Sequence, residues 1–292
     1  MSRISQSYPV TKVTFDDGVE GDYTVDTRGD MVSVEEPLEL RVNGTTITTT
    51  MRTPGNDLEL VHGFLHAEGH IVEAGQIDNA RYCGGATGPN GENTYNLIEA
   101  ELSRDVLPLS LDSIRLTTTT SACGVCGSTS IDSIMDKRRH PLTPVRLDPR
   151  VIVSLPEKLR AQQKQFRRTG GIHAAGAFTL DGEPIVVRED VGRHNAADKV
   201  IGHLLMNDML PAEDVILVMS SRASFELVQK AVMAGIPALV AVSAASSLAV
   251  DLARETGMSL TGFTRENRFN LYSGELAEKA AAEQSSEAAS RS

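Results

Sequence analysis

The spacing of apolar and polar residues changes character near residue 151. Before this point, an alternating stretch ends at Asn43-Gly44, a pair typical of a type I′ hairpin turn, and a β-branched run follows. We therefore expect an antiparallel hairpin over Val32–Thr50. Apolar residues at helical spacing then predict one helix within Leu58–Gly69. The first half of the chain thus predicts mixed α and β structure.

From residue 151 onward, segments with helical spacing alternate with short apolar runs of strand length. Such alternation is the pattern of a three-layer α/β unit, in which helices cover both faces of a sheet. The expected helices are 155–166, 196–205, 223–234 and 247–256, and the expected strands are 174–179, 184–187, 215–219, 238–242 and 258–263.

These patterns divide the chain into four segments. Residues 1–30, which are polar and rich in Gly and Asp, are expected to be poorly ordered, and the Ala-, Glu- and Ser-rich tail 274–292 is expected to be disordered. Residues 31–150 are expected to form an N-terminal α+β domain that carries a Cys-x-x-Cys loop. Residues 151–273 then form a C-terminal α/β domain.

Charge and composition argue against several classes of protein. Lys and Arg number 28 against 39 Asp and Glu, which gives a net charge of −11 at pH 7. With no Trp and only 4% aromatic residues, the chain lacks the basic surface and stacking platforms of a nucleic-acid-binding protein. No apolar run approaches the ~20 residues of a membrane span. The 3 cysteines are too few for a disulfide scaffold, and the first residues lack a signal-peptide pattern, so we expect a cytoplasmic protein.

The sharpest local signal is the pair Cys123 and Cys126, set among Gly124, Gly127 and small polar residues. Two thiols at this spacing can act as a redox pair, as half of a zinc site, or as a sulfur-carrying nucleophile with its helper. Two thiols buried in a glycine-rich turn are the simpler alternative. Cys83 has no partner nearby in sequence and is interpreted as an incidental thiol.

A zinc-dependent deaminase is the main rival pattern. His66-Ala67-Glu68 ahead of Cys123-x-x-Cys126 resembles the deaminase order of His-x-Glu followed by Pro-Cys-x-x-Cys. The copy is imperfect, because an alanine precedes the first cysteine where proline is required. His62, His66 and His70 could also form a metal cluster, because His62 and His66 are four residues apart on a helix, but a satisfied, half-buried histidine face is the favoured interpretation.

The second half carries four polar segments directly after expected strands. Ser220-Ser221-Arg222 and the serine-rich turn 243–247 each open a helix, so their hydroxyls and free helix N–H groups are expected to meet anions at the carboxyl edge of the sheet. Serine N-capping explains either turn alone. Phe263–Arg268 adds an aromatic face and arginines that suit a purine nucleotide.

The fourth segment is the charged stretch 188–195. Its charges must pair with one another or meet a ligand unless they lie in a solvated surface loop.

Five separated motifs together resemble the formate dehydrogenase accessory sulfurtransferases, the FdhD family, over about Val32 to Tyr272. The motifs are Arg52-Thr-Pro-Gly-Asn-Asp57, Ser121-Ala-Cys-Gly-Val-Cys-Gly127, Thr169-Gly-Gly-Ile-His-Ala-Ala175, Glu189-Asp-Val-Gly-Arg-His-Asn195 and Ser220-Ser-Arg222.

The resemblance implies an α/β protein whose C-terminal domain is similar to the cytidine deaminase fold but lacks deaminase chemistry. It also implies a sulfurtransferase that accepts persulfide sulfur from a cysteine desulfurase. The sulfur passes to the molybdenum bis(molybdopterin guanine dinucleotide) cofactor destined for formate dehydrogenase, which is bound as cargo, and no permanently bound metal is implied. Cys123 would carry the persulfide, and Cys126 would relay sulfur or close a disulfide that releases it.

The cofactor-binding segment of the family corresponds to 263–268, and the anion-site interpretation adds residues from the turn after 219. The expected cofactor-binding residues are Phe263, Thr264, Arg265, Glu266, Asn267, Arg268, Ser220, Ser221 and Arg222. Expected partners are the desulfurase, formate dehydrogenase and a second copy of the chain, because the resemblance implies a homodimer.

Several points stay open on sequence alone. A zinc-dependent nucleoside deaminase and a non-catalytic chaperone of the cofactor are the alternative functions. The spacing does not decide whether Cys123 or Cys126 carries sulfur, or whether His173 or His194 assists proton transfer. We expect the thiol segment to be a flexible, exposed loop.

Overall fold

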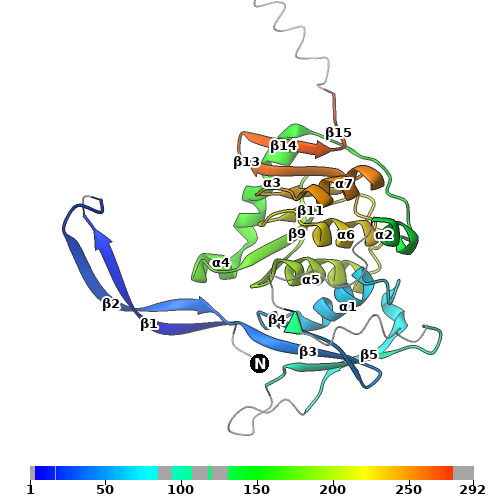
Figure 1. Cartoon of the computed structure of the whole chain (residues 1–292), viewed down its shortest axis with the longest axis horizontal. Helices are drawn as coiled ribbons and strands as arrows, with labels where there is room; N and C mark the ends of the chain where they lie inside the picture. Colours follow the sequence, from blue (N-terminus) through cyan, green and yellow to red (C-terminus); the bar gives the residue numbers. More distant parts are fainter. Residues whose placement is uncertain (1–3, 17, 85–93, 107–117, 120–130, 279–292) are drawn as a thin grey trace, which may run out of the picture.

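The computed structural model of the protein describes residues 4–16, 18–84, 94–106, 118–119 and 131–278. The chain forms a mixed α/β structure in which a five-stranded and a six-stranded sheet lie on opposite sides of a helical layer (Figure 1). Among the described residues, no helix combines the length and apolarity that crossing a bilayer requires.

The five-stranded sheet has the strand order β5-β6-β3-β4-β7. Asn43 (φ 49°) and Gly44 (φ 81°) both adopt the left-handed conformation that a type I′ turn requires, so the predicted hairpin of β3 and β4 is confirmed. The strands are β3 (Glu36–Val42), β4 (Thr45–Arg52), β5 (Ile77–Tyr82), β6 (Leu97–Leu102) and β7 (Thr118–Thr119), and the 3-10 helix η1 (Ala74–Gln76) precedes β5.

Helix α1 (Asp57–Ala67) connects the two halves of the molecule. Its apolar positions pack on the inner face of the five-stranded sheet. Its other side crosses α5 (Arg193–Met206) so closely that a Cβ on Gly63 would lie 1.9 Å from the Asp198 carbonyl oxygen. Only glycine leaves room for the two backbones to touch in this way.

The six-stranded sheet has the order β10-β9-β11-β12-β13-β14. Its central strands β11, β12 and β13 are parallel, whereas β9, β10 and β14 pair antiparallel at the sides. The strands are β9 (His173–Thr179), β10 (Pro184–Asp190), β11 (Val215–Met219), β12 (Ala238–Ala241), β13 (Ser259–Arg265) and β14 (Arg268–Ser273).

Helices cover both faces of this sheet, which confirms the predicted three-layer unit. Along β11, Ile216 and Val218 pack into the cluster under α3, whereas Leu217 and Met219 pack into the cluster that includes α5, α6 and α7. The narrower likeness to cytidine deaminase stays a prediction. The helices are α2 (Ile131–Lys137), α3 (Pro149–Gln162), α4 (Lys164–Thr169), α5, α6 (Phe225–Met233) and α7 (Ser247–Thr256).

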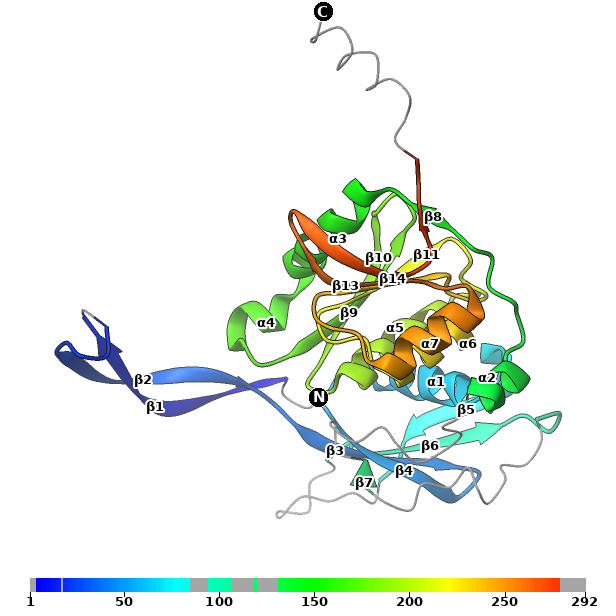
Figure 2. The same ribbon diagram turned by 45° about the horizontal axis from the view of Figure 1, so that its top comes forward.

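The N-terminal segment, expected to be poorly ordered over 1–30, contains two paired strands. Strands β1 (Ser5–Phe15) and β2 (Tyr23–Ser33) form an antiparallel arm that projects from the body of the molecule (Figures 1 and 2). The Val and Thr residues of the arm favour strands, but both faces of the arm are largely exposed, so the sequence lacks the alternation of a half-buried strand. The described part of this segment therefore forms paired strands, and its expected poor order stays a prediction.

Two further boundaries differ from the expected ones. The helix expected over 155–166 begins earlier, because the Asp148 carboxylate accepts a hydrogen bond from the Arg150 amide (2.7 Å), and it ends before Gln163. The expected tail contributes strand β15 (Glu275–Leu276), which pairs with β8 (Arg146–Leu147). The tail beyond residue 278 lies outside the described residues.

Candidate functional site

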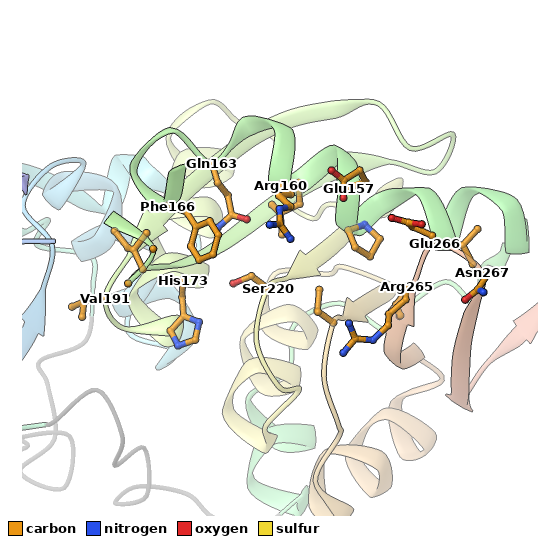
Figure 3. Close-up of a pocket in the computed structure, with 18 residues that line it drawn as sticks. Glu157, Arg160, Gln163, Phe166, His173, Val191, Ser220, Arg265, Glu266 and Asn267 are labelled. Carbon is orange, nitrogen blue, oxygen red and sulfur yellow. The ribbon is translucent and has the colours of Figure 1, made fainter. Parts of the chain in front are cut away.

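A cavity of about 750 Å³ lies between α3 and the carboxyl ends of the central parallel strands. Strands β11, β12 and β13 contribute Ser220, Val242 and the turn after β13, while α3 and α4 form the facing wall (Figure 3). The carboxyl edge of a parallel sheet is the usual place for a ligand in an open α/β fold, because strand ends and helix N-termini meet there. This cavity is therefore the candidate site.

The turn between β13 and β14 brings most of the predicted nucleotide segment to the cavity. Thr264, Arg265, Glu266 and Asn267 line it, and Figure 3 shows the last three together at one end. Arg265 of β13 is the backbone partner of Arg268 of β14, and a two-residue turn joins them. The residues of this turn, Glu266 and Asn267, therefore lie beyond the strand ends.

Two residues of the predicted segment lie outside the cavity lining. Phe263 has a positive φ of 52° and a 42% exposed side chain, and Arg268 is exposed on β14. The structure therefore separates the segment into four residues that line the cavity and two that do not.

The three residues of the turn after β11 also differ in whether they line the cavity. Ser220 lines the cavity, and its hydroxyl accepts a hydrogen bond from the Ala174 amide at 2.9 Å, which fixes β11 beside β9. Ser221 is buried and donates to the Arg222 carbonyl at 3.1 Å. The Arg222 residue is exposed and is not among the lining residues. Of the three, only Ser220 reaches the cavity.

The facing wall supplies groups that the sequence did not single out. The Arg160 guanidinium carbon lies 5.9 Å from the centroid of the Phe166 ring, and both residues line the cavity. Glu157 adds a carboxylate on the same helix as Arg160. Neither Arg160 nor Arg265 forms an ion pair with another described residue. The cavity therefore offers two guanidinium groups to an anionic ligand.

His173 lies at the end of the cavity opposite Glu266 (Figure 3). Burial lowers the pKa of its imidazole, the Arg193 charge lowers this pKa further, and Asp190 acts in the opposite direction. His173 is therefore neutral at pH 7. His194 is not among the lining residues, and its Nε2 lies 3.2 Å from the Ser224 hydroxyl.

Most charged side chains of the stretch 188–195 form hydrogen bonds or ion pairs with other residues of the protein. Lys199 Nζ donates to Asp190 Oδ2 at 2.6 Å and to the Thr53 carbonyl at 2.9 Å, and the Thr53 amide donates back to Asp190. Glu189 accepts two hydrogen bonds of 2.8 Å from backbone amides at the start of α4. These contacts join the end of β4 to the start of α5 and hold α4 in place.

The motif from Arg52 to Asp57 is held together by a buried ion pair. The Arg52 guanidinium donates to Asp57 Oδ2 at 3.0 and 3.1 Å and is 0% exposed. The Tyr82 hydroxyl donates to the same carboxylate oxygen at 3.0 Å, and burial followed by the Asp57 charge raises the pKa of that hydroxyl. Two of the five motifs therefore build the scaffold beneath the site.

The histidines of α1 bind backbone carbonyls. His62 Nδ1 lies 2.7 Å from the Leu58 carbonyl and His66 Nε2 lies 3.1 Å from the Met233 carbonyl, and burial lowers the pKa of both imidazoles. Within the described ranges, no cluster of His, Cys, Asp and Glu is arranged to hold a metal ion. The deaminase pattern built on His66 therefore gains no support from the described geometry.

The thiol pair Cys123 and Cys126 lies outside the described residues, and so does the expectation of a flexible loop there. Cys83 is partly exposed, and its thiol lies 4.0 Å from the Arg81 carbonyl.

Comparison with known proteins identifies the family. The model of the FdhD/NarQ family matches residues 33–278. A sulfur carrier protein FdhD from Corynebacterium efficiens is 61% identical over 94% of this chain and 100% of its own length. A protein of the same name from Nocardia farcinica is 55% identical over 85% of this chain and 88% of its own.

A solved structure supports the fold independently. It is a crystal structure of a protein from Desulfotalea psychrophila, provisionally assigned as a formate dehydrogenase accessory protein. It superposes with a TM-score of 0.67 at 24% identity and covers 92% of this chain and 97% of its own. The family model and the curated relatives together show that this chain belongs to the FdhD/NarQ family.

Proposed function

We propose that this protein is a sulfur carrier in the maturation of formate dehydrogenase. It takes persulfide sulfur from a cysteine desulfurase and passes it to the molybdenum bis(molybdopterin guanine dinucleotide) cofactor, which it binds as cargo. The names of the curated relatives support the role as a sulfur carrier. The observation that carries the cargo assignment is the cavity of about 750 Å³ lined by Ser220 and residues 264–267.

The cavity suits a guanine nucleotide in size and chemistry. Its volume falls within the roughly 300–1,000 Å³ typical of small-molecule sites. Arg160 and Arg265 supply positive charge, and the Phe166 ring offers a face for a purine. Glu157 and Glu266 carry carboxylate oxygens that accept hydrogen bonds from the N1–H and N2 amino groups of guanine. Adenine does not present this pair of donors, so the wall favours guanine.

The transfer chemistry follows from the thiol pair. The Cys123 thiolate attacks the terminal sulfur of the donor persulfide, a new S–S bond forms, and the donor cysteine leaves as a thiolate. Cys126 thiolate then attacks the Cys123 sulfur, closes a disulfide and releases hydrosulfide, which becomes the sulfido ligand of molybdenum. A dithiol reductant regenerates both thiols.

Mass spectrometry after loading tests the sulfur-carrier assignment. The protein is incubated with a cysteine desulfurase and free cysteine in a Cys83→Ala background, which removes the third thiol. We expect one added sulfur atom on Cys123 or Cys126, because these thiols carry the proposed nucleophile. The control is the Cys123→Ala/Cys126→Ala variant, which should gain no sulfur.

Cellular complementation separates the proposal from its alternatives. The Cys123→Ala/Cys126→Ala variant should fail to restore formate dehydrogenase activity in cells that lack the protein. Normal activity of this variant would instead establish a non-catalytic chaperone. Stoichiometric zinc that is lost on Cys126→Ala would favour a deaminase.

A further inference from the structure

The N-terminal arm of β1 and β2 projects from the body of the molecule and is exposed along most of its length (Figures 1 and 2). Each strand has 11 residues, so the arm is about 37 Å long at 3.4 Å per residue. A two-stranded hairpin is at best marginally stable in water when nothing covers its faces. Most of the arm therefore lacks, within its own chain, the cover that such a hairpin needs.

The pairing register gives the arm two different faces. Residues directly opposite each other in β1 and β2 share a face, and successive residues alternate between faces. One face carries Lys12 opposite Asp26. The other face consists of the odd-numbered residues of Ser5–Phe15 and Tyr23–Ser33 and contains no Asp, Glu, Lys, Arg or His. We call it the uncharged face.

Side chains on the uncharged face change in size along the arm. Near the turn that joins the strands, which we call the tip, the Phe15 and Tyr23 ring centroids lie 5.7 Å apart and Val13 lies opposite Val25. These four residues are 44% to 61% exposed. At the other end, the root, Ser5 lies opposite Ser33. Only the outer half of this face is therefore apolar, and two arms laid antiparallel place the large residues of each over the small residues of the other.

The two ends of the arm also differ in charge. Three exposed acidic residues are described at the tip: Asp16, Glu20 and Asp22. Helix α4 lies beside the root, because Ser33 Oγ lies 2.7 Å from Thr169 Oγ1. This helix carries three exposed basic residues: Lys164, Arg167 and Arg168. Within the described ranges, none of these six side chains forms an ion pair.

A second copy of this chain fits the arm better than an unrelated protein does. The acidic tip and the basic α4 lie at opposite ends of the same arm, so each end complements the other end of an antiparallel copy. Ser33, which contacts α4, belongs to the uncharged face, so α4 stands on the side of the arm that carries the exposed aromatic rings. Charge and shape therefore select the same arrangement.

We propose that the arm of each copy docks on a second copy of this chain, antiparallel to the arm of that copy. The uncharged faces pack against each other, and each acidic tip meets α4 of the other copy. A twofold axis makes both contacts twice. Residues at the start and end of α4 line the cavity or adjoin it, so each arm reaches a wall of the cavity in the other copy. This docking does not rest on the proposed sulfur transfer.

Sedimentation velocity of charge-reversal variants of the full chain tests the docking. The tip variant is Glu20→Lys/Asp22→Lys, and the α4 variant is Lys164→Glu/Arg168→Glu. Each alone should raise the dimer dissociation constant about tenfold or more, because like charges then meet at both contacts. The matched control is Glu213→Lys/Asp214→Lys, which reverses two exposed charges in the turn before β11 and should leave the constant unchanged.

An equimolar mixture of the tip variant and the α4 variant provides the sharpest test. The mixture should form a heterodimer with nearly the native affinity, because the reversed tip of one copy meets the reversed α4 of the other. The native tip of the second copy meets the native α4 of the first in the same complex. Misfolding of either variant cannot produce this recovery.

A second pair of variants tests the uncharged face. Phe15→Ser/Tyr23→Ser should also raise the dimer dissociation constant about tenfold or more, because the exposed rings supply the apolar contact. Thr14→Ser/Thr24→Ser is the control, since these exposed residues lie opposite each other on the other face of the arm. Circular dichroism establishes that each variant is folded.

Three results would overturn the docking. The first is a native chain that remains monomeric, which would leave the arm to a different protein. The second is a native dimer that neither charge-reversal variant weakens, since another surface would then form it. The third is a mixture that associates no more tightly than the separate variants.

Discussion

At the scale of single residues, the Lys199–Asp190 pair shows how this protein keeps charge in its interior. The Lys199 side chain is 2% exposed and that of Asp190 is 0% exposed, with 2.6 Å between Nζ and Oδ2. Burial raises the pKa of the Asp190 carboxyl, and the Lys199 charge and amide donors oppose this effect. The pair is stable because every donor and acceptor in it has a partner, so removing one member leaves a buried charge unmatched.

We expect Lys199→Met to lower the free energy of unfolding by about 3–5 kcal/mol, because the Asp190 carboxylate then lacks its counter-charge. Urea denaturation followed by circular dichroism measures this loss. Lys158→Met is the matched control, since Lys158 is 37% exposed beside a 72% exposed Glu183. The control should lose less than about 1 kcal/mol. Equal losses in both variants would show that the buried pair has no special role.

At the scale of elements, the contact between α1 and α5 depends on two glycines. A Cβ on Gly202 would lie 1.8 Å from the Glu59 carbonyl oxygen, and Gly63 faces the Asp198 carbonyl in the same crossing. Both glycines lie inside helices, where alanine is usually preferred by about 1 kcal/mol. The close approach of the backbones therefore outweighs helix propensity.

Gly202→Ala should consequently lower the free energy of unfolding by about 1–3 kcal/mol, the usual cost of overpacking, because the two helices must move apart. Thermal or urea unfolding checks the sign. Gly75→Ala serves as the control, since a Cβ there meets nothing within 4 Å. A Gly202→Ala variant that is as stable as the native protein would contradict the described crossing.

The sequence predicted the elements that have one clear periodicity. The strand expected at 215–219 and the helix expected at 247–256 match β11 and α7, because each carries an uninterrupted apolar or amphipathic pattern. The arm of β1 and β2 and strand β14 were missed for the opposite reason. Their residues are exposed or only partly buried, so burial imposes no alternation on the sequence. Paired but solvated strands are hard to distinguish from loops in a single sequence.

At the scale of the whole molecule, the cavity is the result of packing between distant segments. The turn containing 264–267 was predictable, because the carboxyl ends of parallel strands meet at one edge. The positions of Arg160 and Phe166 were not predictable, because these residues line the cavity only through the packing of α3 and α4 across that edge. The charged stretch 188–195 was ambiguous in sequence, and the structure shows that its pairing partners include Thr53, Lys199 and Glu59.

The central claim is that this cavity binds the guanine nucleotide of the cargo. Titration of guanosine diphosphate into the native chain and into Arg265→Ala tests it most directly, with Arg81→Ala as the exposed control. The account predicts binding by the native chain, a loss of about tenfold or more in Arg265→Ala, and no change in the control. Absence of binding, or equal affinity in Arg265→Ala and the native chain, would contradict it.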